Sequence, residues 1–210
     1  MKKKKRSYNT LRALYDLLFC LVLIFVIQYI LAMIQINPVT KDKDAPEPKA
    51  EFIITVTWPD DYQDDVDTYV KDPSENVVFF RAREEGLMHL DRDDLGRRND
   101  RIITPNGVIE FKGNREIVTL RNITPGEFVV TVHMYHKVLA GRKVPVTIEL
   151  TKLNPYSIVT RNEVVLFKTG DEELAFRFRV NPDGDVTKID HRSAKLATKI
   201  AEEENGGYTP

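Results

Sequence analysis

The chain has 210 residues with 31 basic and 32 acidic side chains, which gives a formal net charge of -1. Six of the basic residues and one acid lie in residues 1–16, so the remainder of the chain is acidic. An acidic body repels phosphate, and we therefore expect no nucleic-acid partner. The single cysteine, Cys20, excludes an intramolecular disulfide and a cysteine-based zinc site. The length allows one ordinary domain with appendages.

Residues 1–10 are predicted to form a basic cytoplasmic arm, and residues 11–37 a transmembrane helix. Residues 17–36 contain no charged side chain, and twenty such residues are the length that a helix needs to cross a hydrocarbon core of about 30 Å. A cleaved signal peptide is the alternative, but it would have a shorter apolar stretch and a small-residue cleavage site. We therefore expect an uncleaved single-pass anchor.

The charges on either side of this span predict its orientation. The run from Lys2 to Arg6 lies on one side, and the acidic part of the chain lies on the other. Because basic segments stay in the cytoplasm, the N-terminus is predicted to be cytoplasmic and the C-terminal domain exported. We expect the bacterial inner membrane, with the domain in the periplasm.

Asp16 lies at the start of the uncharged span and has two interpretations. It could lie at headgroup level and pair with Arg12, four residues earlier on the same helix. It could instead be a membrane carboxylate that binds and releases a proton or a sodium ion. Gln28 and Gln35 are seven residues apart on one helical stripe, and we predict that they pack against another helix by hydrogen bonds. The alternative is that both glutamines lie near the outer interface.

The segment Tyr15-Asp16-Leu17-Leu18-Phe19, placed after a short basic arm and before an apolar run, resembles the B subunits of bacterial ion-driven motors, namely MotB, ExbD and TolR. This resemblance implies that Asp16 carries the ion. It also implies a multispanning MotA/ExbB/TolQ-like membrane subunit as partner and a homodimer of this chain within that complex. The chain departs from MotB in having no peptidoglycan-binding domain of the OmpA type.

Residues 38–50 are rich in proline and charge and are predicted to be a linker. Residues 51–190 are predicted to form a mainly antiparallel, all-β sandwich, because short alternating segments are separated by turn residues. Residues 191–210 are predicted to be a tail with a short helix and a disordered end. The alternating segments are residues 51–58, 77–83, 107–112, 116–121, 127–136, 143–150, 157–167 and 174–180.

The stretch from Asp65 to Pro73, followed by Asn76 to Phe80, resembles the YfaP-like β-sandwich family. The later Pro125-Gly126 turn that leads into an aromatic-ended strand fits the same pattern. This resemblance implies the sandwich fold and does not imply a biochemical role.

Aspartates gather at residues 60–67 and 91–100. Calcium prefers such oxygen ligands, and if the domain holds a metal we expect Ca²⁺ on Asp65, Asp67 and Asp91. Neither stretch follows an EF-hand loop and arginines interleave with the second one, so ion pairs and solvated loops are the favoured alternative.

Trp58 and Tyr62 could form a stacking platform for a carbohydrate, with core packing as the alternative. Nucleophile, phosphate-loop and HExxH motifs are absent from the sequence, and we expect a protein that is not an enzyme. The leading hypothesis is the small subunit of a proton- or sodium-driven membrane motor or energy transducer. The alternative is a passive membrane-tethered sandwich that recognises an envelope protein or glycan.

Overall fold

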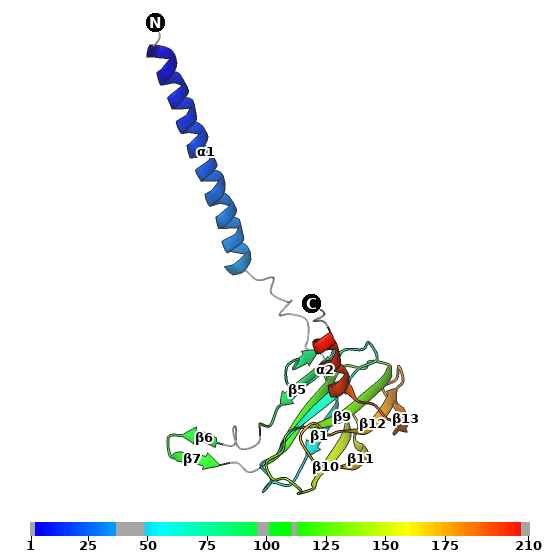
Figure 1. The fold of residues 1–210 in the computed structure, drawn as a ribbon. Coiled ribbons are helices and arrows are strands. Elements are labelled where there is room, and N and C mark those ends of the chain that lie inside the picture. The colour runs from blue at the N-terminus through cyan, green and yellow to red at the C-terminus, as the bar shows by residue number, and fades with distance from the viewer. Residues whose placement is uncertain (1–2, 37–48, 96–100, 111–112, 207–210) are drawn as a thin grey trace. The chain divides into compact units, whose positions relative to one another are not determined.

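The structure is a computed structural model of the chain, and it describes residues 3–36, 49–95, 101–110 and 113–206 (Figure 1). The chain divides into two units, residues 1–47 and residues 48–210, and each is described by itself. The predicted fold class is confirmed, because a long apolar helix is followed by a mainly β domain with two antiparallel sheets. The predicted linker at residues 38–50 lies almost wholly outside the described residues.

The first unit contains α1 (Lys3–Ile36). Its stretch Leu11–Met33 has 23 residues and a mean hydropathy of 2.5. By length and composition this stretch is able to cross a membrane, as a membrane anchor or a signal sequence does. Every side chain from residue 11 to residue 33 is exposed in the structure.

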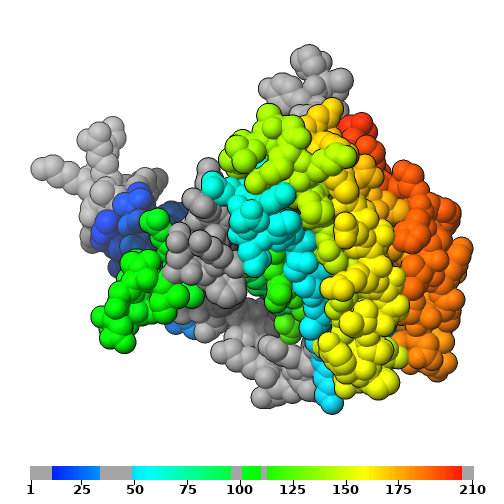
Figure 2. All heavy atoms as spheres, turned by 90° about the horizontal axis from the view of Figure 1, so that it is seen from below, coloured from blue at the N-terminus to red at the C-terminus, as the bar shows by residue number. Residues whose placement is uncertain are grey.

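The second unit contains two antiparallel sheets. The first has the strand order β11-β10-β1-β8-β5-β4, and the second has the order β13-β12-β9-β2-β3. Figure 2 shows the outer surface of the first sheet, where β1 (cyan) lies beside β10 (yellow) and β10 lies beside β11. The strand bounds are β1 Ala50–Thr57, β2 Asp65–Lys71, β3 Val77–Val78, β4 Glu84–Glu85, β5 Met88–Arg92, β8 Arg115–Arg121, β9 Gly126–His136, β10 Val144–Leu153, β11 Tyr156–Leu166, β12 Glu172–Val180 and β13 Val186–Asp190.

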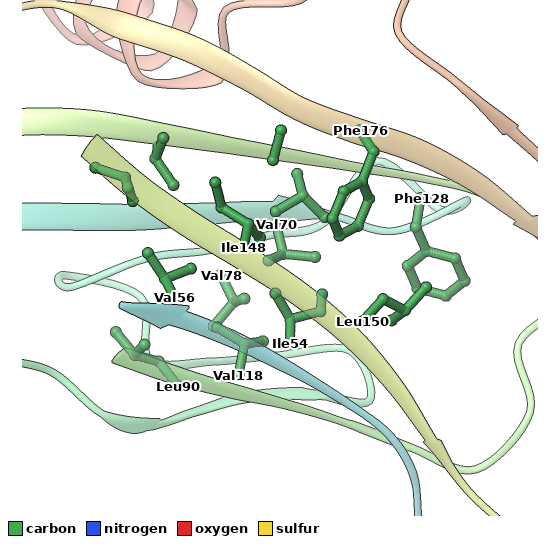
Figure 3. Close-up of a cluster of buried hydrophobic side chains, with 14 of the residues drawn as sticks. Ile54, Val56, Val70, Val78, Leu90, Val118, Phe128, Ile148, Leu150 and Phe176 are labelled. Carbon is green, nitrogen blue, oxygen red and sulfur yellow. The ribbon is translucent and has the colours of Figure 1, made fainter. Parts of the chain in front are cut away.

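The core lies between the two sheets and follows from strand alternation. Ile54 and Val56 of β1 point inward, and the alternate residues Ile53, Thr55 and Thr57 are only partly buried. They meet Val70 and Phe176 of the second sheet (Figure 3). Complete burial of such side chains contributes about 1.5–3 kcal/mol each, which makes this layer the main source of stability.

The second sheet is also covered on its outer face, by α2 (Leu196–Gly206). Strand β2 is therefore buried on both sides, with Val66 and Val70 in the main core and Tyr69 in a smaller apolar cluster with Leu196. The last four residues of the predicted tail lie outside the described residues.

Glu172, a buried side chain of β12, holds the first turn of α2. Its carboxylate accepts hydrogen bonds from the N–H groups of Ala197 and Thr198 at 2.9 and 3.0 Å, and from the hydroxyl groups of Thr131 and Thr198. A negative charge at a helix N-terminus satisfies unpaired N–H groups and interacts favourably with the helix dipole. The helix is thereby fixed to the second sheet.

A separate hairpin is formed by β6 (Arg101–Thr104) and β7 (Gly107–Glu110). The sequence predicts residues 107–112 as a strand of the sandwich, but β7 pairs with β6 in a sheet of its own. The physical reason lies in its pattern: Val108 and Ile109 are adjacent, so they point to opposite faces and cannot both enter one core. Ile102, Ile103, Val108 and Ile109 are between 55 and 86% exposed.

Candidate functional site

Three carboxylates from distant parts of the sequence meet at one edge of the sandwich. Asp67 lies in β2, Asp93 directly follows β5, and Glu116 lies in β8. One oxygen of each lies within 4.8 Å of the other two. Since β2 belongs to one sheet and β5 and β8 to the other, the group spans both sheets.

The free edge of β2 explains why Glu116 is held there. Strand β3 pairs with only Val70 and Lys71, so the first part of β2 has no neighbouring strand on that side among the described residues. The N–H of Thr68 donates instead to Glu116 Oε2 at 2.6 Å. Glu116 shares the inward face of β8 with Val118 and Leu120, which directs its carboxylate into the gap between the sheets.

Two oxygens of this group are buried without a hydrogen-bond donor. Glu116 is 1% exposed and Asp67 is 3% exposed, and neither Glu116 Oε1 nor Asp67 Oδ2 has a hydrogen-bond partner in the described part of the chain. His133 Nδ1 lies 4.0 Å from Asp67 Oδ2, which is beyond hydrogen-bond distance. A buried acceptor without a partner is costly, so the arrangement calls for a proton or a cation.

The electrostatics of the group agree with its geometry. Burial raises the pKa of Glu116 well above its usual value, and the charges of Asp67 and Asp93 add to that rise, while Thr68 opposes it. Burial also raises the pKa of Asp67, and His133 opposes the rise. Both carboxyl groups therefore hold protons more tightly than free side chains do.

Of the three predicted metal ligands, the structure brings only Asp67 into this group. Asp65 lies two residues before Asp67 on β2, opposite His136 in the ladder between β2 and β9. Asp91 accepts a hydrogen bond from the Thr119 hydroxyl and lies 4.0 Å from Arg121. Asp93 and Glu116 replace them in the group. The signal for Glu116 was its spacing from Val118 and Leu120, which predicts an inward-facing charge.

A second buried carboxylate, Asp64, is fully paired. It is completely buried and accepts hydrogen bonds from the N–H of Val138 at 2.8 Å, from Arg142 at 3.0 Å and from Lys137 at 3.2 Å. Burial alone would raise its pKa, but these three donors together hold the pKa below the usual value. This network joins the start of β2 to the connection between β9 and β10, which is a structural role.

Trp58 and Tyr62 lie beside this network. Trp58 is 3% exposed, and its indole N–H donates to the carbonyl oxygen of Asp64 at 3.0 Å. Tyr62 packs against the core with the Arg142 guanidinium over its ring at 3.5 Å. Trp58 also borders a surface hollow of about 680 Å³ together with Pro59, Arg92 and Asn114. The indole therefore offers only an edge to solvent.

A groove of about 400 Å³ lies between α2 and the outer face of the second sheet. Four aromatic side chains line it: Tyr69, Phe79, Phe80 and Tyr135. Tyr69 and Phe79 stack with ring centroids 5.2 Å apart, and Arg81 pairs with Glu204 of α2 at 2.9 Å across the rim. His133 lines the groove as well as lying near Asp67, so the groove and the carboxylates are neighbours.

Asp16 lies inside the apolar stretch of α1, five residues after its start at Leu11. Its side chain is exposed, and no described residue forms an ion pair or a hydrogen bond with it. Gln28 is exposed on the same helix, and the side chain of Gln35 lies outside the described residues.

No family model matches the chain, and no curated protein matches it. The crystal structure of the unknown-function protein SAV2460 is similar, with 19% sequence identity and a TM-score of 0.44. The similarity covers 71% of this chain and 94% of that protein.

Proposed function

We propose that this chain is a non-enzymatic, single-pass subunit of an ion-driven membrane complex, in which Asp16 carries a proton or a sodium ion and the β-sandwich is the exported effector. The observation that carries the proposal is the position of Asp16 in an apolar helix with no partner in the described part of the chain. Ionisable groups inside membrane spans are costly and are usually paired or functional.

Asp16 requires a second protein for this role. The side chains of residues 11–33 are all exposed, and in a membrane an isolated helix would expose them to lipid. A carboxylate can exchange an ion with water only where a partner helix lines a polar path to it. The proposal therefore includes a multispanning MotA/ExbB/TolQ-like subunit, a second copy of this chain and a bacterial inner-membrane location with the sandwich in the periplasm.

The test uses a hydrophobic carbodiimide, which reacts with protonated carboxyl groups inside membranes. The full chain is tagged and labelled in native membranes, and the modified residue is identified by mass spectrometry. We expect modification at Asp16, protection by raised pH or by sodium, and none in Asp16→Asn. A multispanning protein should co-purify with the tag. Unmodified Asp16, or a complex without any multispanning subunit, would contradict the proposal.

A second candidate function, a passive membrane-tethered binding module, is favoured by the β6–β7 hairpin. Its cross-strand pairs, Ile102 with Ile109 and Ile103 with Val108, lie on opposite faces, so both faces are apolar. A hydroxyl-rich glycan would not cover four exposed aliphatic side chains, whereas an apolar groove of an envelope protein would. This function predicts that Ile103→Ser with Val108→Ser abolishes partner capture while Asp16→Asn leaves it unchanged.

A further inference from the structure

We propose that Asp67, Asp93 and Glu116 bind a calcium ion that links the two sheets of the sandwich. The proposal is independent of Asp16 and of the membrane complex, because it concerns only residues of the β domain. It depends on two observations: the oxygens of the three carboxylates converge within 4.8 Å, and two buried oxygens among them lack a hydrogen-bond donor.

The first step of the argument is charge. Three carboxylates so close together repel one another strongly inside a protein, where the effective dielectric constant is well below that of water. His133 Nδ1 lies 4.0 Å from Asp67 Oδ2, which is too distant for a hydrogen bond to that carboxylate. A divalent cation would neutralise two of the three charges.

The second step concerns the oxygen atoms that are available to bind a cation. Glu116 Oε2 already accepts the N–H of Thr68, which orients the side chain and leaves Oε1 for another partner. Asp67 Oδ2 is likewise buried without a hydrogen bond. All of these potential ligand atoms are carboxylate oxygens, and hard cations such as Ca²⁺ and Mg²⁺ prefer oxygen ligands.

The third step selects between these two ions. Oxygens on opposite sides of Ca²⁺ lie about 4.6–5.2 Å apart, since Ca²⁺–oxygen distances are about 2.3–2.6 Å. For Mg²⁺ the corresponding separation is only about 4.0–4.2 Å, and the octahedron is strict. The three ligands come from three separate segments, and such a set suits the larger and more adaptable ion better than one that demands a strict octahedron.

A bound ion would fasten the free edge of β2 to the opposite sheet. In the described part of the chain, the Thr68–Glu116 hydrogen bond is the direct polar link between β2 and β8. Calcium would add ionic links from β2 to both β8 and the end of β5. The ion would therefore stabilise the sandwich as a whole.

The experiment measures thermal unfolding of the full chain in detergent micelles, followed by the fluorescence of its single tryptophan, the buried Trp58. Unfolding is compared in EDTA, in CaCl₂ and in MgCl₂. At a Ca²⁺ concentration a hundred times Kd, we expect the Tm to rise by about 5–10 °C relative to EDTA. Mg²⁺ should give a smaller shift, and an equal shift would overturn the choice of calcium.

Two variants locate the ion. Glu116→Gln keeps an acceptor for Thr68 but removes a charge, so it should be at least as stable as the wild type in EDTA and should lose the response to Ca²⁺. Asp91→Asn is the matched control, because Asp91 lies outside the carboxylate group and pairs with Thr119; it should keep the response. A wild-type Tm that is equal in EDTA and Ca²⁺, or a full Ca²⁺ shift in Glu116→Gln, would overturn the proposal.

Discussion

The backbone N–H of Thr68 and the carboxylate of Glu116, 48 residues apart in the sequence, form a buried hydrogen bond of 2.6 Å between the two sheets. Glu116→Ala would leave that N–H buried without an acceptor, which costs about 1–3 kcal/mol. Glu116→Gln retains an acceptor and removes repulsion from Asp67, so it should cost nothing in the absence of cations. Urea unfolding followed by Trp58 fluorescence measures the free energy of unfolding of each variant. Equal losses of stability in Glu116→Ala and Glu116→Gln would contradict this account.

Substitution of Asp64 is expected to destabilise the domain more than substitution of most other charged residues. Asp64→Ala leaves the nearly buried Lys137 without its carboxylate and removes the acceptor of the Val138 N–H. Loss of one partner from a buried ion pair costs about 3–5 kcal/mol. Asp60→Ala, at an exposed position nearby, is the control and should change the free energy of unfolding by less than about 0.5 kcal/mol.

The lowered pKa of Asp64 predicts that the stability of the domain depends on pH. The pKa of Asp64 is lowered in the folded domain, whereas in the unfolded chain it should be near 3.9. Its contribution to stability is therefore fully present above about pH 4 to 5 and is lost as the pH falls through the lower, folded pKa. Urea unfolding between pH 3 and pH 7 should show a decline on the acid side that is reduced in Asp64→Asn. If Asp64→Asn lost as much stability at low pH as the wild type does, groups other than Asp64 would be responsible for the loss.

Glu172 is predicted to determine whether α2 stays on the sheet. Glu172→Ala removes the acceptor for two N–H groups of the first turn, and the loss of such a cap costs about 1–2 kcal/mol. We expect faster hydrogen exchange across Leu196–Gly206 while β9 remains protected. Glu173→Ala is the matched control, since Glu173 is the adjacent and exposed residue. Equal exchange in the two variants would show that the apolar contacts of Leu196 are enough to hold α2 on the sheet without Glu172.

The sequence predicts the fold better than the site. The fold follows from patterns within single strands, whereas the site depends on contacts between residues that are distant in the sequence. Alternation within residues 51–58 or 127–136 is local, and it reports directly which side chains enter the core. The carboxylate group depends on which strand lies beside the edge of β2, and alternation carries no information about that neighbour. Asp67 was a visible candidate because it lies in a cluster of aspartates, whereas the spacing of Glu116 indicates a buried charge but does not show that Asp67 is its neighbour. The burial of Tyr69 on the outer face of the second sheet likewise depends on α2, more than 120 residues later.

Gly126 and Pro73 belong to two motifs that the sequence presents separately, and in the domain they are packed against each other. A Cβ on Gly126 would lie 2.5 Å from Pro73 Cγ, and the backbone of Gly126 has φ of +138°. Gly126→Ala should therefore combine steric overlap with backbone strain and cost about 2–4 kcal/mol. Gly170→Ala is the matched control, because Gly170 also has a positive φ, +88°, but no atom near the added Cβ. It should cost only about 1 kcal/mol. Equal losses in urea unfolding of the two variants would mean that backbone strain alone explains the glycine and that contact with Pro73 contributes nothing.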